Sequence, residues 1–278
     1  MEESLNRIAE AILGLYSDPI KDYILPAITS LASAAFGAWA AFYAVNVQER
    51  NRIHIQNVDS INEAILCANN ARNTLISIKS NYAGQLTSNP YQRLLTVTRM
   101  LKNGDPITFQ ISKLIFIAPS DPTKIYSKWQ KVAYIESLFS NYNHVLDIWT
   151  KRNETLDKII PKLTPYHGQP ISLNELYENI EPGQLAILSD LTEHALMMTD
   201  DILIELSCLI VGLPEVGKKS IPKKVINKYR KIISILLPNN EMAVNLLSLT
   251  PELDNEAAAK LHNSTASEVK ERYRRVYP

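Results

Sequence analysis

Hydrophobic and polar positions divide the chain into one long uncharged stretch and several later segments with helical periodicity. From Tyr23 to Val47 there are 25 residues without a charge, YILPAITSLASAAFGAWAAFYAVNV. As a helix this stretch would be about 37 Å long, enough to cross a hydrocarbon core of about 30 Å. Trp39, Phe42 and Tyr43 lie toward its C-terminal end, where interfacial aromatic residues are found. We therefore predict a transmembrane helix over 23–47.

Two other interpretations of this stretch stay open. It is rich in alanine and only moderately hydrophobic, which is also compatible with a buried core helix. A cleaved signal peptide is disfavoured because residues 1–22 are acidic, whereas a signal peptide begins with basic residues. Within 1–22, Leu5, Ile8, Ile12 and Leu15 share one helical face, which predicts a short amphipathic helix on the membrane surface or against another subunit.

Basic residues beside the span predict its orientation. The N-terminal flank carries Arg7 and Lys21 among five acidic residues, and Arg50 and Arg52 follow the span closely. Because basic residues mark the cytoplasmic side, we expect the N-terminus outside and the C-terminal domain in the cytoplasm.

Small residues recur at four-residue spacing within the span. Ser33, Gly37 and Ala41 form one such stripe. Stripes of this kind let two helices approach closely in lipid, and a serine can add a hydrogen bond across the contact. They predict a homo-oligomer, although a segment rich in alanine and serine also produces such spacings by chance.

The residues after the span predict one helical domain over 48–240, followed by a polar C-terminal segment over 241–278. The strongest pattern lies in 122–160, where apolar residues keep the three-four spacing of a coiled-coil seam. Glu136 and Asn153 are its polar members; each could fix register or simply face water.

Two shorter helices are predicted from their first residues. Asn89 before Pro90 is typical of a helix start, and Ser172 with Glu175 forms a capping box. Residues 106–118 alternate like a strand and also recur like a helix, and we favour a short helix after an extended start.

Proline and glycine predict where the long helices begin and end. Pro161 is expected to close the 122–160 helix, and Pro182 to open another that ends before Gly212 and Pro214. Long helices with narrow apolar stripes are not stable alone in water. We therefore predict an all-α protein whose transmembrane helix continues into an elongated antiparallel, coiled-coil-like bundle.

Composition supports the helical class and points to no partner. The formal net charge is zero and only eight glycines occur among 278 residues. Cys67 and Cys208 are far apart and lie in apolar helical patterns, so two buried structural thiols are expected.

No catalytic constellation emerges from the titratable residues. None of the five histidines has metal-ligand spacing to another histidine or a cysteine. The densest group joins Glu193 and His194 with Asp190, Asp200 and Asp201, and a solvated helix face explains it. Phosphate-binding loops, dinucleotide fingerprints and nucleophile elbows are not found. We expect no enzyme, no metal, no cofactor and no small-molecule substrate.

One basic segment stands out. Between Glu215 and Glu241 the sequence has no acidic residue, while 222–236 places apolar residues on one face of a predicted amphipathic helix. Such a helix can bind anionic lipid, a partner or nucleic acid, or can be a bundle helix with a solvated cationic face. The seven basic residues are Lys218, Lys219, Lys223, Lys224, Lys228, Arg230 and Lys231.

Two stretches carry a resemblance to known proteins, FGAWAAFYAVNVQERNR at the end of the span and SNYNHVLDIWTKRNETLDKIIPKL further on. With the long helix between them, most of 23–210 resembles a broad family of poorly characterised bacterial single-pass proteins, some of the retron-like membrane-effector type. The resemblance implies an inner-membrane protein with a cytoplasmic helical domain, linked to defence or mobile elements. It transfers no catalytic residue.

Three functions follow as hypotheses. The first is a membrane-anchored, non-enzymatic effector or accessory protein of a phage-defence system, such as a retron or a toxin–antitoxin-like module. Its partners would be the lipid bilayer, further copies of itself, and a protein or ribonucleoprotein that restrains the cytoplasmic bundle. The alternative is a membrane-tethered scaffold or sensor without toxicity. A helical nucleic-acid-binding protein that uses the basic segment is the least favoured.

Overall fold

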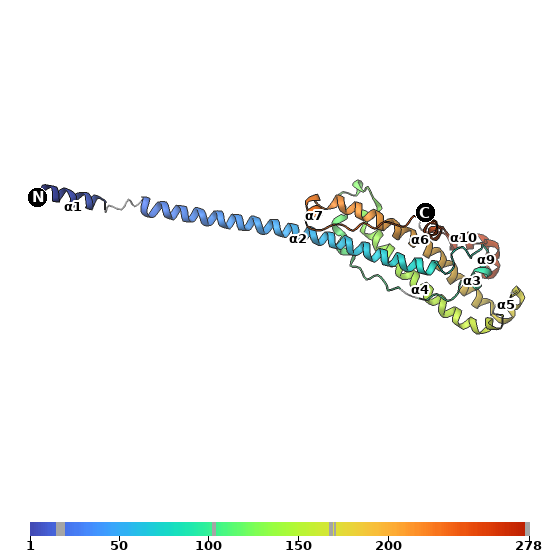
Figure 1. The fold of residues 1–278 in the computed structure, drawn as a ribbon. Coiled ribbons are helices and arrows are strands. Elements are labelled where there is room, and N and C mark those ends of the chain that lie inside the picture. The colour runs from blue at the N-terminus through green and yellow to red at the C-terminus, as the bar shows by residue number, and fades with distance from the viewer. Residues whose placement is uncertain (15–19, 102–103, 167–168, 170, 276–278) are drawn as a thin grey trace. The chain divides into compact units, whose positions relative to one another are not determined.

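The computed structural model shows a helical protein (Figure 1). No strand occurs in the part of the chain that it describes, so the predicted helical class is confirmed. The chain forms two compact units, Met1–His54 and Ile55–Pro278, whereas the sequence placed its domain boundary at 47/48. The described residues are 1–14, 20–101, 104–166, 169 and 171–275.

The first unit contains α1 (Glu2–Gly14), a short π-helix (Ile20–Ile24) and the start of α2 (Leu25–Lys79). The α1 helix accounts for most of the predicted N-terminal helix, and Leu15 lies outside the described residues. Pro26 is the second residue of α2, directly after the π-helix.

One helical stretch among the described residues, Ile20–Lys79, is long and apolar enough to cross a membrane. Its most apolar window of 18 residues has a mean hydropathy of 1.5 and contains no buried residue. The predicted continuation of the span into a long helix is also observed, since α2 runs without a break to Lys79.

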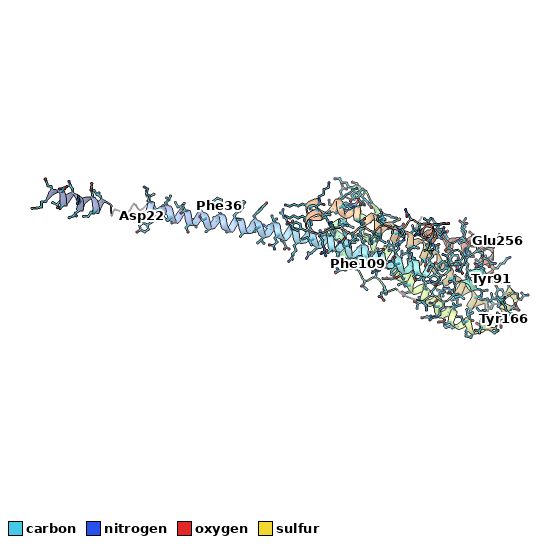
Figure 2. The ribbon with its side chains drawn as sticks, in the orientation of Figure 1. Asp22, Phe36, Tyr91, Phe109, Tyr166 and Glu256 are labelled. Atoms are coloured by element: carbon cyan, nitrogen blue, oxygen red, sulfur yellow. The ribbon has the colours of Figure 1, made fainter. Side chains whose placement is uncertain are left out.

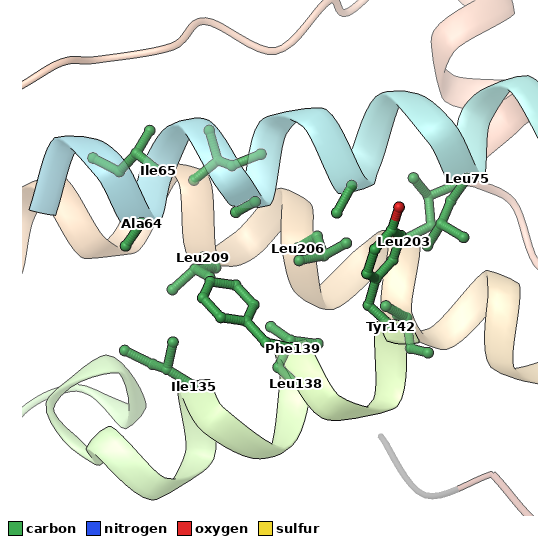
Figure 3. Close-up of a cluster of buried hydrophobic side chains, with 14 of the residues drawn as sticks. Ala64, Ile65, Leu75, Ile135, Leu138, Phe139, Tyr142, Leu203, Leu206 and Leu209 are labelled. Carbon is green, nitrogen blue, oxygen red and sulfur yellow. The ribbon is translucent and has the colours of Figure 1, made fainter. Parts of the chain in front are cut away.

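The core of the second unit lies between the later part of α2, α4 (Val132–Leu163) and α6 (Pro182–Ser220), as Figure 3 shows. Ile65 of α2, Phe139 of α4 and Leu206 of α6 meet there. Each fully buried aliphatic or aromatic side chain of this size stabilises the fold by about 1.5–3 kcal/mol. Apolar packing therefore holds these three helices together.

Polar contacts give the register of the three helices. Arg72 of α2 donates to Ser207 of α6. Lys79, which follows seven residues later in α2, pairs with Asp200 of α6. From α4, Trp149 donates to Thr199 and Arg152 to Thr192. Later residues of α2 and of α4 therefore contact earlier residues of α6.

Several predicted helix signals are confirmed. Asn89 caps α3 (Pro90–Thr96), and Ser172 forms a capping box with Glu175 at the start of α5 (Leu173–Asn179). The ambiguous stretch 106–118 is extended at first and then forms a 3-10 helix. The short 3-10 helices are Ile111–Ile117, Pro122–Lys124, Lys128–Gln130 and Thr164–Tyr166.

The seam helix begins ten residues later than 122, at Val132. Two short 3-10 turns precede it, because Asp121 and Ser127 each cap a turn with their side chains. Asn153, a polar member of the seam, is buried and bonds to both the N–H and the carbonyl of Met100. Glu136 is exposed.

The prediction that the last long helix stops before Gly212 and Pro214 is wrong, because α6 continues through both to Ser220. A Cβ on Gly212 would lie 2.2 Å from the indole of Trp129. The glycine thus permits a close approach between elements instead of ending the helix. Similarly, α4 continues past Pro161 to Leu163.

The predicted polar C-terminal segment belongs to the second unit. It contains α8 (Glu241–Leu247), α9 (Asn255–His262) and α10 (Ala266–Arg272). We call residues 240–275 the C-terminal arm. The expectation of two buried thiols is wrong, since Cys67 is only partly buried and Cys208 is exposed.

Candidate functional site: a charged cluster beneath the C-terminal arm

Three carboxylates of α6 lie in the interior of the second unit. Glu193, Asp200 and Asp201 are each no more than 6% exposed. Positions seven and eight apart fall on one face of a helix, so a single face of α6 presents all three. The predicted solvated face is therefore wrong at these residues, because the C-terminal arm and two other elements cover them.

The first pair joins the end of α2 to the middle of α6. Lys79 Nζ lies 2.7 Å from Asp200 Oδ1, and the two side chains are 3% and 0% exposed. The same ammonium group donates a hydrogen bond to the Ser248 carbonyl of the arm. Lys79 therefore binds α6 and the arm at once.

The second pair joins α3 to α6. Arg93 Nη1 lies 2.5 Å from Glu193 Oε2. The remaining donors of Arg93 reach the Thr87 carbonyl, 2.7 Å from Nε, and the Pro251 carbonyl of the arm. Burial raises the pKa of the Glu193 carboxyl, and the adjacent guanidinium opposes that rise.

The arm adds its own cation to the cluster. Arg275 places Nη1 2.5 Å from Asp201 Oδ1 and Nη2 3.3 Å from Asp200 Oδ2. Asp200 Oδ2 also accepts a hydrogen bond of 2.7 Å from the Thr250 N–H. Burial raises the pKa of the Asp201 carboxyl, which Arg275 counteracts. The charged cluster, as we use the term, consists of Lys79, Arg93, Glu193, Asp200, Asp201 and Arg275.

A second set of polar contacts holds α10 against α6. The Tyr273 hydroxyl donates to Asp190 Oδ1 at 2.9 Å and lies 3.2 Å from His262 Nε2. His194 Nδ1 is 2.9 Å from the Asp190 carbonyl, and its ring packs against Tyr273. His194 Nδ1 also lies 3.5 Å from Asp190 Oδ1, and this side-chain contact raises the pKa of His194 and lowers the pKa of the Asp190 carboxyl.

Two hollows flank residues 248–251 of the arm. One, of about 760 Å³, is lined by Arg93 and Glu193 on the helices and by Lys270 and Arg274 on the arm. The other, of about 170 Å³, is lined by Lys79 and Tyr82. Leu249, Thr250 and Pro251 border both hollows.

The contacts define what the cluster can do chemically. Its charges are paired, and they bind main-chain groups of the arm: two carbonyls and one N–H. Within the described part of the chain, no group of three or more histidine, cysteine or acidic side chains is placed to hold a metal ion. The cluster therefore binds the main chain of the arm in this structure.

The seven basic residues of the predicted lipid- or partner-binding segment are exposed and lie at the end of α6, in α7 (Lys223–Lys228) and just beyond it. Lys218 pairs with Glu215 and Arg230 with Asp59, at 2.6 Å in both cases. Lys219 lies over the ring of Tyr126, 4.1 Å from its centroid.

The prediction of one amphipathic helix over 222–236 is wrong, since α7 is only six residues long. Asn62 of α2 donates to the Lys231 carbonyl at 3.0 Å and accepts from the Ile233 N–H at 2.8 Å. These bonds occupy the main-chain groups that a longer helix would use itself. The apolar Val225 and Ile232 are buried against the unit instead.

The predicted small-residue interface of the span is exposed in this single chain. Ser33, Gly37 and Ala41 are exposed, and a Cβ on Gly37 would meet no atom within 4 Å. The Ser33 hydroxyl donates to the Thr29 carbonyl of its own helix at 2.7 Å. A partner helix has room to approach beside Gly37.

Sequence reasoning found the acidic residues of the cluster but missed their partners. Lys79, Arg93 and Arg275 come from three separate regions of the chain, and no local spacing links them. One usable signal was the positions of Glu193, Asp200 and Asp201 on a single face of a helix rich in apolar residues.

Comparisons with known proteins add no family to this description. No protein-family model matches the chain, and neither a curated protein nor a solved structure matches it.

Proposed function

We propose that this chain is a membrane-anchored, non-enzymatic effector or accessory protein that acts through a protein partner and through the bilayer. The N-terminal part of α2 would span the inner membrane of a bacterium. The second unit would form an elongated helical bundle in the cytoplasm, in which α6 runs antiparallel to α2 and α4. The observation that carries this proposal is the uncovered apolar surface of the helical residues from Tyr23 to Val47.

Large apolar side chains project from this part of α2. Leu31, Phe36 and Trp39 are 75%, 72% and 66% exposed, and Figure 2 labels Phe36 on this helix. A helix that is apolar all round is buried in protein or lies in lipid. The described residues of the chain leave these side chains uncovered, which favours lipid.

The basic residues support the orientation. Arg50 and Arg52 follow the span, and Arg230, just beyond α7, pairs with Asp59, nine residues after Arg50. Basic residues on this side favour the cytoplasmic face. The surface around Lys223 and Lys228 is suited to anionic headgroups, each charge near the surface contributing about 1 kcal/mol.

Membrane insertion can be tested on the full chain. An aspartate at the centre of a span costs about 2.5–3.5 kcal/mol, so we expect Ala35→Asp with Ala38→Asp to abolish insertion. Flotation of cell membranes separates inserted protein from aggregates, and an alkaline wash removes peripheral protein. Ala35→Leu with Ala38→Leu is the matched control and should float like the wild type. A wild-type chain that does not float would overturn the proposal.

The resemblance of the sequence makes the proposal more specific, as an effector of a phage-defence system restrained by a partner. Induced expression with a membrane-potential dye tests this version. Loss of potential with arrested growth would support an effector that perturbs the membrane. Unchanged growth and potential would instead support the second candidate, a membrane-tethered scaffold or sensor.

A further inference from the structure

We propose that the charged cluster is a binding site for an extended peptide segment, which residues 248–251 of the C-terminal arm occupy in this structure. In this proposal the arm is a detachable latch, and a segment of a partner protein takes its place. The inference goes beyond the proposed function and does not depend on membrane insertion.

The first support is the pattern of main-chain recognition. Lys79 binds the Ser248 carbonyl, Asp200 binds the Thr250 N–H and Arg93 binds the Pro251 carbonyl. These groups succeed one another along a stretch without helical structure. Because main-chain bonds are largely independent of side-chain identity, another extended segment can make the same three bonds.

The second support is the composition of the contact. Apolar side chains hold α2, α4 and α6 together, whereas buried ion pairs and main-chain bonds hold residues 248–251 and Arg275. Buried ion pairs are a weak source of stability compared with apolar packing. When the arm detaches, water can solvate the charged groups that remain, whereas it would not solvate an apolar surface.

The third support is the internal organisation of the arm. Its helices α9 and α10 have a small core of their own, formed by Ala258, Ala259 and Val269. Leu247 and Leu261 connect the arm to the apolar clusters of the longer helices. An arm with its own core can leave the cluster without unfolding α2, α4 or α6.

The fourth support is unfilled space. The hollow of about 170 Å³ borders residues 248–251, and its walls outside the arm include Lys79, Tyr82 and Leu86. A peptide with larger side chains than the arm's strip has room against these residues. The site is therefore larger than the segment that fills it.

A fluorescent peptide with the sequence of residues 245–255 tests the site on the full chain in detergent micelles. The wild type should bind it weakly because the arm competes. Val269→Asp places a charge in the arm's own core and leaves all six cluster residues intact, so it should raise peptide affinity about tenfold or more. Adding Lys79→Met to that variant should remove the gain.

A second peptide makes the test specific for the main chain. Methylation of the amide nitrogen at the position of Thr250 removes the N–H donated to Asp200 and keeps every side chain. The loss of a hydrogen bond to a buried carboxylate should weaken binding to the Val269→Asp chain about tenfold or more. Equal binding of both peptides would overturn the proposal, as would no binding by a Val269→Asp chain whose helical circular dichroism is retained.

Hydrogen exchange of the unmodified chain provides an independent check. Peptides covering 241–275 should exchange together and well before those of α4 and α6, because the latch opens locally. An arm that exchanges only with global unfolding of α6 would overturn the proposal even if the variants misfold.

Discussion

Gly212 of α6 lies directly against the indole ring of Trp129, and a Cβ on the glycine would come within 2.2 Å of Trp129 Cδ1 and Nε1. We predict that Gly212→Ala destabilises the second unit by about 1–3 kcal/mol, since the buried ring would have to move. Urea unfolding, followed by circular dichroism, measures the loss of unfolding free energy. Gly183→Ala is the matched control, because a Cβ there meets nothing within 4 Å. A Gly212→Ala chain as stable as the control would contradict the prediction.

The Lys79–Asp200 pair should be costly to break at one end. Asp200→Asn leaves a buried ammonium without its carboxylate, for which we expect a loss of about 3–5 kcal/mol in unfolding free energy. Adding Lys79→Met removes the unpaired charge and should recover part of the loss. Asp157→Asn, which breaks the exposed pair with Arg99, should cost less than about 1 kcal/mol. A double variant no more stable than Asp200→Asn would rule out a coupled pair.

The contact between His194 and Asp190 should make stability depend on pH. Because the fold raises the pKa of His194, protonation favours the folded state. This contribution is fully present below about pH 6.5, the unfolded value, and is lost as the pH rises through the raised pKa. The wild type should therefore be more stable than His194→Gln at pH 5.5. This difference in unfolding free energy should shrink by at most about 1 kcal/mol as the pH rises to 8.5.

Two features of that experiment make it decisive. The lowered pKa of Asp190 keeps its carboxylate charged across this range, so it adds no slope of its own. His144→Gln, on the exposed face of α4, is the control for loss of a histidine. If the difference in unfolding free energy between the wild type and His194→Gln is larger at pH 8.5 than at pH 5.5, the ion pair does not stabilise the fold.

Gly37→Leu should weaken association of the spans. In lipid, close packing of small residues rather than hydrophobicity holds helices together, so a leucine in the stripe would keep them apart. We expect less crosslinked oligomer in membranes with insertion retained, because leucine favours the hydrocarbon. Ala35→Leu, on a different side of the helix, is the control. If Gly37→Leu and Ala35→Leu give the same oligomer yield, the stripe is not an interface.

The sequence by itself determined the helical class, the long apolar segment and several helix ends. Each rests on neighbouring residues: 25 uncharged positions after Asp22, Asn89 before Pro90, and Ser172 three residues before Glu175. Capping and hydrophobic periodicity act over one or two turns, so they can be read locally.

Only the tertiary structure decided the continuation of α6 past Gly212, the short α7 and the burial of Asp200. Gly212 depends on Trp129, which is remote in sequence, and α7 ends where Asn62 binds the main chain of Lys231. Asp200 looks like a solvated acid until Lys79 of α2 and Arg275 of the arm are placed beside it. A charge is stable in the interior only with such partners, and pairing between residues far apart in sequence is set by the fold.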